Sequence, residues 1–388
     1  MEVALSPRRV AIVGAALSDT GRVDDKTVHE LHYQGVTRAL ADAGLTKDDV
    51  QGFCSVGTGA LAPVEIAEYL GLRPTWADST GVGGAAWEFM LEHATAAIAM
   101  GQVDVVVLSY GSTTRADLKR GRRRANLSFG SGGPLQFEAP YGHALIAKYG
   151  MATQRHMHEF GTTIEQLAEI AVSARYNAQF NPDAYYRDPI TVEDVQSSPM
   201  IATPFTKLHC CIRSDGGGAI VLTSEDRARD CAQAPVWVLG TGEAISHTTM
   251  SEWEDFTESP CVRSGADAFG RAGVKPDDID LCELYDAFTG MVLLTIEGLG
   301  FCKKGEGGPF VADARLRLGG ELPTNTDGGG LSACHPGMRG IFLLIEAARQ
   351  LRGDYAGSAR QVPDAELACV SATGGWFSAT STAILGRN

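Results

Sequence analysis

The chain repeats part of itself. The stretch ALADAGLTKDDVQGFCSV, which starts at Ala39, aligns without a gap with AFGRAGVKPDDIDLCELY, which starts at Ala268, so that Gly44 matches Gly273. Each stretch predicts a helix that ends at a glycine, a short acidic turn and then a strand. Such a repeat predicts a duplicated βαβ fold rather than two unrelated domains.

Further elements follow the same order in the two parts of the chain. The β-branched, apolar run at 9–17 predicts a buried strand, and the run at 234–245 predicts its counterpart. The runs at 83–101 and 335–353 predict a second pair of helices, each ending at a glycine. We therefore divide the chain into an N-terminal half, residues 1–230, and a C-terminal half, residues 231–388.

The segment at about 112–200 interrupts the N-terminal half. It is rich in Arg, Tyr, His and Met, and it predicts two helices with a loop between them. Inserted segments of this kind commonly cover the active face of a core, so we expect a lid. The sequence SDGGGAIVLTS that follows, at 214–224, predicts a glycine packing turn and then a strand.

Charge and cysteine usage exclude several classes of protein. The net charge of −14 argues against broad nucleic-acid binding, which requires a basic face. The basic run from Lys119 to Arg124 predicts either a solvated loop or a site for a phosphorylated ligand or an acidic partner. The nine cysteines show no CxxC pair and no framework spacing, so we expect buried thiols in a reducing compartment and no metal site.

The sequence predicts a cytoplasmic protein. The apolar stretch near the start is too short for a signal peptide and lacks a cleavage pattern. No uninterrupted apolar run is long enough for a membrane-spanning helix, so we expect no membrane association.

Four motifs in order carry a family resemblance. They are SDGGGAIVLTS (214–224), ELYDAF (283–288), GGGLSACHPGMRG (328–340) and SATGGWFSATSTAIL (371–385). With the duplication, they resemble the thiolase superfamily, and the stretches HMHEFGTT and LPTNTDGGG favour its sterol-carrier-protein and lipid-transfer-protein branch. The resemblance spans essentially the whole chain. It implies an α/β thiolase fold, in which duplicated βαβαβαββ halves with mixed five-stranded sheets form an α-β-α-β-α sandwich, usually as a tight dimer.

The nucleophile of thiolases is missing from this sequence. Thiolases use a cysteine at the start of the buried first-half helix, where the helix dipole lowers the pKa of the thiol. The best register places Gly81 at that position, and no cysteine lies between Cys54 and Cys210. The second thiolase cysteine is also absent, because Ala372 or Thr373 stands in its place.

Other parts of the thiolase site persist. By resemblance, His335 of the His-Pro-Gly motif and the backbone N–H groups at Gly81 and Gly374 stabilise an enolate oxygen. Tyr285 replaces a polar residue of the family, and we expect it to handle a proton, with Asp286 orienting it or a neighbour. Steroid side-chain-cleaving lyases resemble this pattern but are expected to carry a tyrosine in place of His335, so the acid and the base stay unassigned.

Non-catalytic interpretations of these residues remain open. His335 could be a structural histidine and Tyr285 a core aromatic, and Cys334 is expected to be a packed neighbour rather than a nucleophile. His247, which follows a strand of the C-terminal half, is a candidate contact for coenzyme A. Tyr141 is a candidate for facing the pocket from the lid.

These residues predict a thiolase-like lyase that cleaves a bulky β-hydroxyacyl-CoA by a retro-aldol reaction. Coenzyme A enters as the thioester substrate, and no bound cofactor is expected. The resemblance implies a homodimer core and a small OB-fold/zinc-ribbon partner of the DUF35 type, which together form a heterotetramer. The alternatives are a Claisen-type thiolase that uses another cysteine or a partner's cysteine, and a non-catalytic acyl-CoA or lipid binder.

Overall fold

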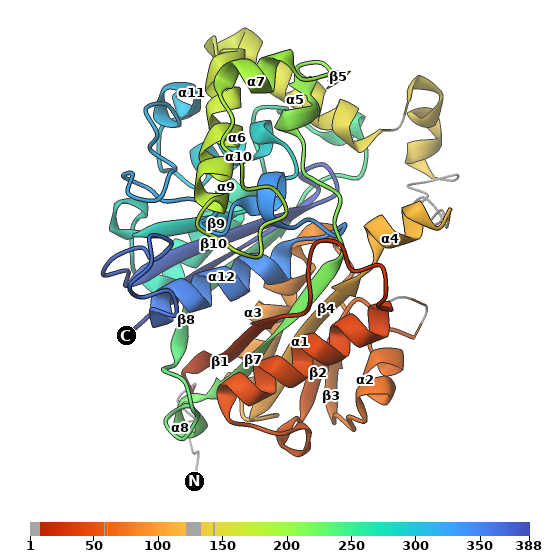
Figure 1. The fold of residues 1–388 in the computed structure, drawn as a ribbon, viewed down its shortest axis with the longest axis vertical. Helices are drawn as coiled ribbons and strands as arrows, with labels where there is room; N and C mark the ends of the chain where they lie inside the picture. Colours follow the sequence, from red (N-terminus) through yellow and green to blue (C-terminus); the bar gives the residue numbers. More distant parts are fainter. Residues whose placement is uncertain (1–7, 58, 60, 122–132, 143) are drawn as a thin grey trace.

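In the computed structural model, which describes residues 8–57, 59, 61–121, 133–142 and 144–388, nine strands form one mixed ladder (Figure 1). Its order is β3-β2-β4-β7-β1-β8-β11-β10-β9. The strands are β1 (Val10–Leu17), β2 (Gly52–Cys54), β3 (Trp76–Asp78), β4 (Val105–Ser112), β7 (Gly216–Ser224), β8 (Val236–Ile245), β9 (Leu281–Leu284), β10 (Leu367–Gly374) and β11 (Ala379–Gly386).

The strands and the helices that pack on them form five layers. Helix α1 (Val28–Ala43) covers one face of the N-terminal strands, and α9 (Cys261–Ala272) covers β8 and β11 of the C-terminal strands. Between the two groups of strands lie α3 (Ala86–Ala99) and α12 (Gly340–Arg352), which contact each other and strands of both halves. Most positions of these two helices are buried, as the apolar character of their sequences predicts. The predicted α-β-α-β-α arrangement is confirmed.

The duplication predicted from the internal repeat is also confirmed. Helices α1 and α9 both end at a left-handed glycine, Gly44 and Gly273. A short 3₁₀ helix follows each of them, over Lys47–Asp49 and Pro276–Asp278, and leads into β2 and β9. The pairing of β1 with β7 and of β4 with β7 recurs as the pairing of β8 with β11 and of β10 with β11.

The C-terminal half differs from the expected five-stranded sheet. Four of its strands are formed, and the position of a fifth is held by a parallel bridge between Cys282 and Thr324. The amide of Cys282 donates to the carbonyl of Pro323, and the amide of Asn325 donates to the carbonyl of Cys282. This contact is too short for a strand, but it carries the chain past the end of β9.

Two local predictions require correction. The glycines of SDGGG do not form a turn, because Gly216, Gly217 and Gly218 are the first residues of β7. They are packing glycines, since a Cβ atom at Gly217 would lie 2.1 Å from the carbonyl oxygen of Tyr110. The C-terminal buried helix begins at Gly340, later than predicted, so His335 does not lie in a first helical turn. The N-terminal one begins with a 3₁₀ turn over Gly83–Ala85, as predicted, and Gly81 precedes that turn.

The inserted segment packs over the C-terminal half (Figure 1). It contains α5 (Leu145–Phe160) and α6 (Ile164–Ala178), as predicted, with α7 (Val192–Ser197), β5 (Met200–Ala202) and β6 (Phe205–Thr206). Helices α5 and α6 contact α10 (Thr289–Gly298), and α6 also contacts a π-helical turn over Gly329–Ala333. The remaining helices are α2 (Val64–Leu70), α4 (Thr114–Lys119), α8 (Glu225–Ala228) and α11 (Gly307–Phe310).

The structure tests two predictions about the surface only for the residues that it describes. The basic run extends from α4 into residues 122–124, which lie outside the described residues. Across the part of the chain that the structure describes, no helix has both the length and the apolar character needed to cross a membrane.

Candidate active site

The side chains of Tyr285 and His335 meet in the interior of the protein. The Tyr285 hydroxyl lies 3.2 Å from Nε2 of His335, and the two rings stand perpendicular to each other. Both side chains are buried. The structure therefore brings together two predicted site residues that are fifty positions apart in the sequence.

Strand β9 and its neighbours position Tyr285. The tyrosine follows the last residue of β9, Leu284, whose amide donates to Oδ1 of Asn325 at 2.8 Å. The amide of Tyr285 donates to the carbonyl of Ser371 in β10 at 3.0 Å. Because these hydrogen bonds hold the backbone of Leu284 and Tyr285 to Asn325 and Ser371, the Tyr285 ring projects from a rigid backbone.

The turn that carries His335 is held from three elements. The amide of His335 donates to Oγ of Ser214, a residue just before β7, at 2.9 Å. The carbonyl of Pro336 accepts hydrogen bonds from the Tyr110 hydroxyl at 2.8 Å and the Thr114 hydroxyl at 3.1 Å. These bonds fix the imidazole in a loop, so side chains from distant elements replace the helix start that the sequence predicted.

The loop over residues 81–84 packs against the same site. A Cβ atom at Gly84 would lie 2.4 Å from Cε2 of Tyr285 and 2.5 Å from the carbonyl oxygen of Thr373. A Cβ atom at Gly374 would lie 1.6 Å from the carbonyl oxygen of Val82. Of the predicted backbone contributors, Gly374 therefore ends β10 in contact with Val82, and Gly81 is the residue before Val82.

Gly81 itself borders open space. No described atom lies within 4 Å of the position that a Cβ atom would occupy there. The position at which a thiolase cysteine is expected thus has room for a side chain and carries none.

Burial sets the protonation states of the pair. It raises the pKa of Tyr285 well above the usual 10, so the phenol is neutral. Burial, with the positive charge of Arg339, lowers the pKa of His335 to about 4. A neutral phenol and a neutral imidazole at 3.2 Å favour a hydrogen bond in which the Tyr285 hydroxyl donates to Nε2.

Asp286 accepts hydrogen bonds from the backbone next to this pair. Its Oδ1 accepts from the amide of Gly330 at 2.7 Å, and its Oδ2 accepts from the amide of Leu331 at 3.1 Å. Burial raises its pKa to about 6, although Arg339 and the two amides oppose the rise. Asp286 therefore bonds the loop that leads to His335, and its orienting role toward Tyr285 or a neighbour stays a prediction.

Replacing Asp286 by asparagine is expected to change how stability depends on pH. The raised pKa of Asp286 contributes stability below pH 4, and this contribution is lost as the pH rises through about 6. The D286N variant has no such ionisation, so its free energy of unfolding should gain about 3 kcal/mol on the wild type between pH 4 and pH 7. Denaturant unfolding at the two pH values measures this difference. A constant difference would contradict the raised pKa.

The structure describes all nine cysteines, and Cys211 and Cys334 are the two to consider as replacement nucleophiles. Cys334 is buried, its sulfur lies 3.2 Å from Oγ of Ser214, and burial raises its pKa to about 12. Cys211 is close enough to Tyr285 for its charge to affect that residue, but burial also raises its pKa to about 12. Neither is a thiolate at neutral pH.

The other two predicted binding residues lie apart from the pair. His247 is buried, with Nε2 3.1 Å from the carbonyl oxygen of Trp376 and its ring stacked on Trp253. It therefore supports the loop next to Gly374. Tyr141 is 90% exposed, so its side chain does not line the buried site from the lid as the sequence suggested.

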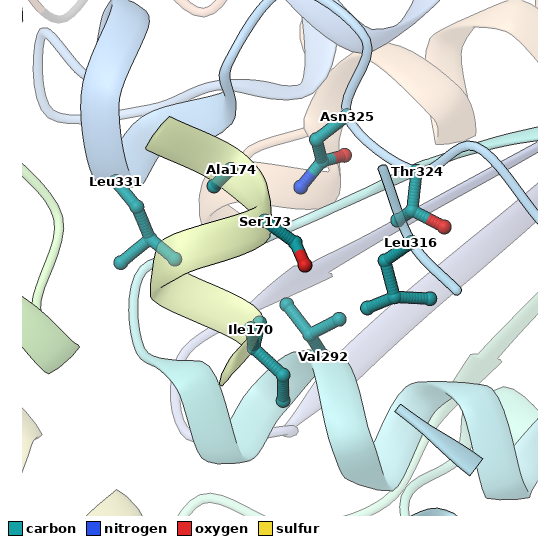
Figure 2. A pocket seen from close by; sticks show the side chains of 8 residues that line it. All are labelled: Ile170, Ser173, Ala174, Val292, Leu316, Thr324, Asn325 and Leu331. Atoms are coloured by element: carbon teal, nitrogen blue, oxygen red, sulfur yellow. The ribbon is translucent and has the colours of Figure 1, made fainter. Parts of the chain in front are cut away.

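A small cavity lies behind the site, between α6 and α10. It holds about 10 Å³ and is lined by Ile170, Ser173, Ala174, Val292, Leu316, Thr324, Asn325 and Leu331 (Figure 2). That volume suits about one water molecule, so this cavity cannot take an acyl chain. Asn325 and Leu331 connect it to the site, because they bond the residues on either side of Tyr285.

Sequence reasoning missed several residues that shape the site. Arg339 is fully buried and pairs with Asp327 at 2.6 Å. The signal for it was an arginine at the start of an otherwise apolar helix. Gly84 and Ser214 carried no signal of their own, because their contacts come from residues far away in the sequence. Within the described ranges, no group of three or more His, Cys, Asp or Glu side chains is arranged to hold a metal ion.

Comparisons with known proteins agree with this arrangement. Residues 242–387 match the family model described as "Thiolase C-terminal domain-like". The 17-hydroxy-3-oxo-4-pregnene-20-carboxyl-CoA lyase of Mycobacterium tuberculosis is 35% identical, over 97% of this chain and 99% of its own. An acetyl-CoA acetyltransferase of Methanothermobacter thermautotrophicus is 32% identical, over 98% of this chain and 100% of its own.

A solved structure extends the likeness to three dimensions. The Ltp2-ChsH2(DUF35) aldolase superimposes with a TM-score of 0.88 and 32% identity, and the match covers 99% of both chains. The chain thus resembles both a lyase and an acetyltransferase over its whole length, and its own site residues must distinguish the two activities.

Proposed function

Because the chain belongs to the thiolase superfamily, in its sterol-carrier-protein-2-like branch, we propose that it cleaves the Cα–Cβ bond of a bulky β-hydroxyacyl-CoA. One observation carries this proposal. The Tyr285–His335 pair is assembled beside Gly84, and Gly81, three residues earlier, is an exposed glycine at the position where a thiolase cysteine is expected. A site that can move a proton but cannot form an acyl-enzyme suits a retro-aldol reaction better than a Claisen reaction.

The proposed reaction begins with proton transfer at the β-hydroxyl group. That group gives its proton to the Tyr285 oxygen while the tyrosine proton moves to Nε2 of His335. The Cα–Cβ bond breaks, its electron pair passes into the thioester as an enolate, and Cβ becomes the carbonyl carbon of a ketone or aldehyde. The same pair then returns the proton to Cα and releases a shorter acyl-CoA.

The enolate oxygen needs hydrogen-bond donors. We propose the backbone N–H groups at Gly81 and Gly374 for this role, because the segment after Gly81 packs against Gly374 at the end of β10 and against Tyr285. Removing one such donor typically costs about 3–4 kcal/mol of barrier. Coenzyme A stays attached through its thioester to the shorter acyl-CoA product in this proposal, and no further cofactor takes part.

The open space at Gly81 supports a bulky substrate. Gly81 is exposed and lies three residues before Gly84, which borders Tyr285, so we propose that the absent side chain leaves room for the substituents on Cβ as the substrate approaches the pair. The lyase of Mycobacterium tuberculosis is named for a steroid carboxyl-CoA, so we propose a polycyclic or similarly large acyl group for this chain as well.

The assembly is part of the proposal. We propose a homodimer core and a DUF35-type partner, as named in the Ltp2-ChsH2(DUF35) aldolase. Strand β3 supports the dimer, because among the described residues it pairs with β2 on one side and with no strand on the other. The Tyr285–His335 pair is buried in the single chain, which fits a site whose access depends on other subunits.

A Claisen-type thiolase is the second candidate, and the proximity of Cys211 to Tyr285 favours it. To separate the two, we would co-purify the chain with its partner and supply β-hydroxyacyl-CoA esters with cyclic and linear acyl groups. We expect a ketone or aldehyde and a shorter acyl-CoA by mass spectrometry, with no acyl adduct on the protein and unchanged turnover in the C211S variant. An adduct that C211S abolishes together with turnover would replace the lyase by the thiolase.

A further inference from the structure

Arg339 connects the two acidic residues behind the site to the loop that carries His335. Its Nη1 donates to the carbonyl of Cys334 at 2.8 Å, and its Nη2 donates to Oδ1 of Asp327 at 2.6 Å. Its Nε lies 3.4 Å from Oδ1 of Asp286. The guanidinium is fully buried, so these protein groups, rather than water, surround its positive charge.

The Arg339 side chain also lies close to the imidazole. A Cβ atom at Gly330 would lie 3.0 Å from Oδ1 of Asp286, 3.0 Å from Cδ2 of His335 and 3.3 Å from Cδ of Arg339. Three side chains therefore converge on one backbone position that has no side chain of its own. Arg339 is the positive group of the three, and its charge contributes to the lowered pKa of His335.

Besides Arg339, the groups that face His335 are neutral hydroxyl and thiol groups and one carboxylate. The Tyr285 phenol and the Cys334 thiol are both neutral at pH 7, because burial raises their pKa values. Asp286, on the β9–α10 connection, is the nearby carboxylate, and it is balanced by Arg339. From β4, the Tyr110 hydroxyl is turned to the carbonyl of Pro336.

We propose that Arg339 is a positioning residue that fixes the His335 loop and, by its charge, keeps the resting imidazole neutral so that Nε2 is free to accept a hydrogen bond from the Tyr285 hydroxyl. The bonds to Cys334 and Asp327 supply the first role, and the approach across Gly330 supplies the second. This inference rests on the proposed function, because a neutral imidazole matters when Tyr285 must pass a proton onward. Arg339 touches no reacting atom, and it acts through His335.

The test is the titration of His335 in the full chain, followed by NMR of labelled histidine side chains. The chain has nine histidines, and the H335Q variant identifies the signal. We expect the wild-type imidazole to stay neutral between pH 5 and pH 8. In R339M, where the charge is lost, its midpoint should rise by about one unit or more into that window. R339K, which keeps the charge but not the planar fork, should keep the wild-type titration.

A matched buried arginine provides the control. Arg360 pairs with Glu346 at 2.5 Å and is nearly as buried as Arg339. R360M should lose a comparable amount of stability and leave the His335 titration unchanged. If R339M does not fold, the R339M/D327N double variant removes both buried charges and should still shift the midpoint.

An unchanged midpoint in whichever of these two variants folds would overturn the inference, and so would an equal shift in R360M. Neither result bears on the lyase proposal, because the titration is measured without substrate. Conversely, a shifted midpoint in a protein that forms an acyl adduct would keep the role of Arg339 and reject the lyase.

Discussion

Replacing Tyr285 by phenylalanine is expected to slow cleavage of a β-hydroxyacyl-CoA by a factor of about 10²–10⁴, the usual range for losing a positioned proton-transfer group. The variant removes one oxygen atom, which lies 3.2 Å from Nε2 of His335, and leaves the aromatic ring in its packing. Stability should change by about 1 kcal/mol, as for the loss of one hydrogen bond. Single-turnover rates of the assembled enzyme, with thermal unfolding alongside, measure the two effects separately.

Tyr149 provides the matched control for this variant. It is also a buried tyrosine, but its hydroxyl donates to the carbonyl of Gly375 and accepts from the amide of Phe377. The Y149F variant should therefore lose stability by a similar amount and keep most of the cleavage rate. Near-normal cleavage by Y285F, or equal losses in Y285F and Y149F, would reject proton transfer by Tyr285.

Adding one methyl group at Gly84 is expected to damage both stability and activity. In G84A the new Cβ atom would lie 2.4 Å from the Tyr285 ring and 2.5 Å from the carbonyl oxygen of Thr373, so the ring or the strand end must move. Overpacking of this kind costs about 1–3 kcal/mol of stability. A displacement of about 1 Å at Tyr285 should lower the cleavage rate by about 10²-fold.

The variant G81A tests the same loop without a clash. Its Cβ atom would meet nothing within 4 Å, so its free energy of unfolding should stay close to that of the wild type. Its effect on activity should depend on the substrate, with larger losses for bulky acyl groups than for linear ones. A stable, fully active G84A, or a G81A that unfolds as readily as G84A, would contradict the packing described here.

The order of elements could be predicted from the sequence because it depends on local patterns. The helix before Gly44 and its counterpart before Gly273 are marked by their capping glycines, and the ungapped repeat relates the two halves. The predictions failed where a local pattern was ambiguous. The glycines at 216–218 favour a turn by composition, but close contact with the neighbouring backbone places them in β7.

The site shows the same division. Tyr285 and His335 were named from their motifs, but the sequence does not say that the hydroxyl and Nε2 lie 3.2 Å apart. It also left the acid and the base unassigned, because ionisation depends on burial and on neighbouring charges. Those neighbours, such as Arg339 beside His335, are defined by packing between loops.

The duplicated α/β architecture and the missing thiol at position 81 follow from the amino-acid sequence alone, because periodicity, capping residues and residue identity are local properties of the chain. Which side chains meet, which of them are neutral and which loops hold them depend on the folded molecule. The physical reason is that hydrogen bonds and desolvation depend on distances between residues far apart in the sequence, and these distances exist only once the two halves have packed around α3 and α12.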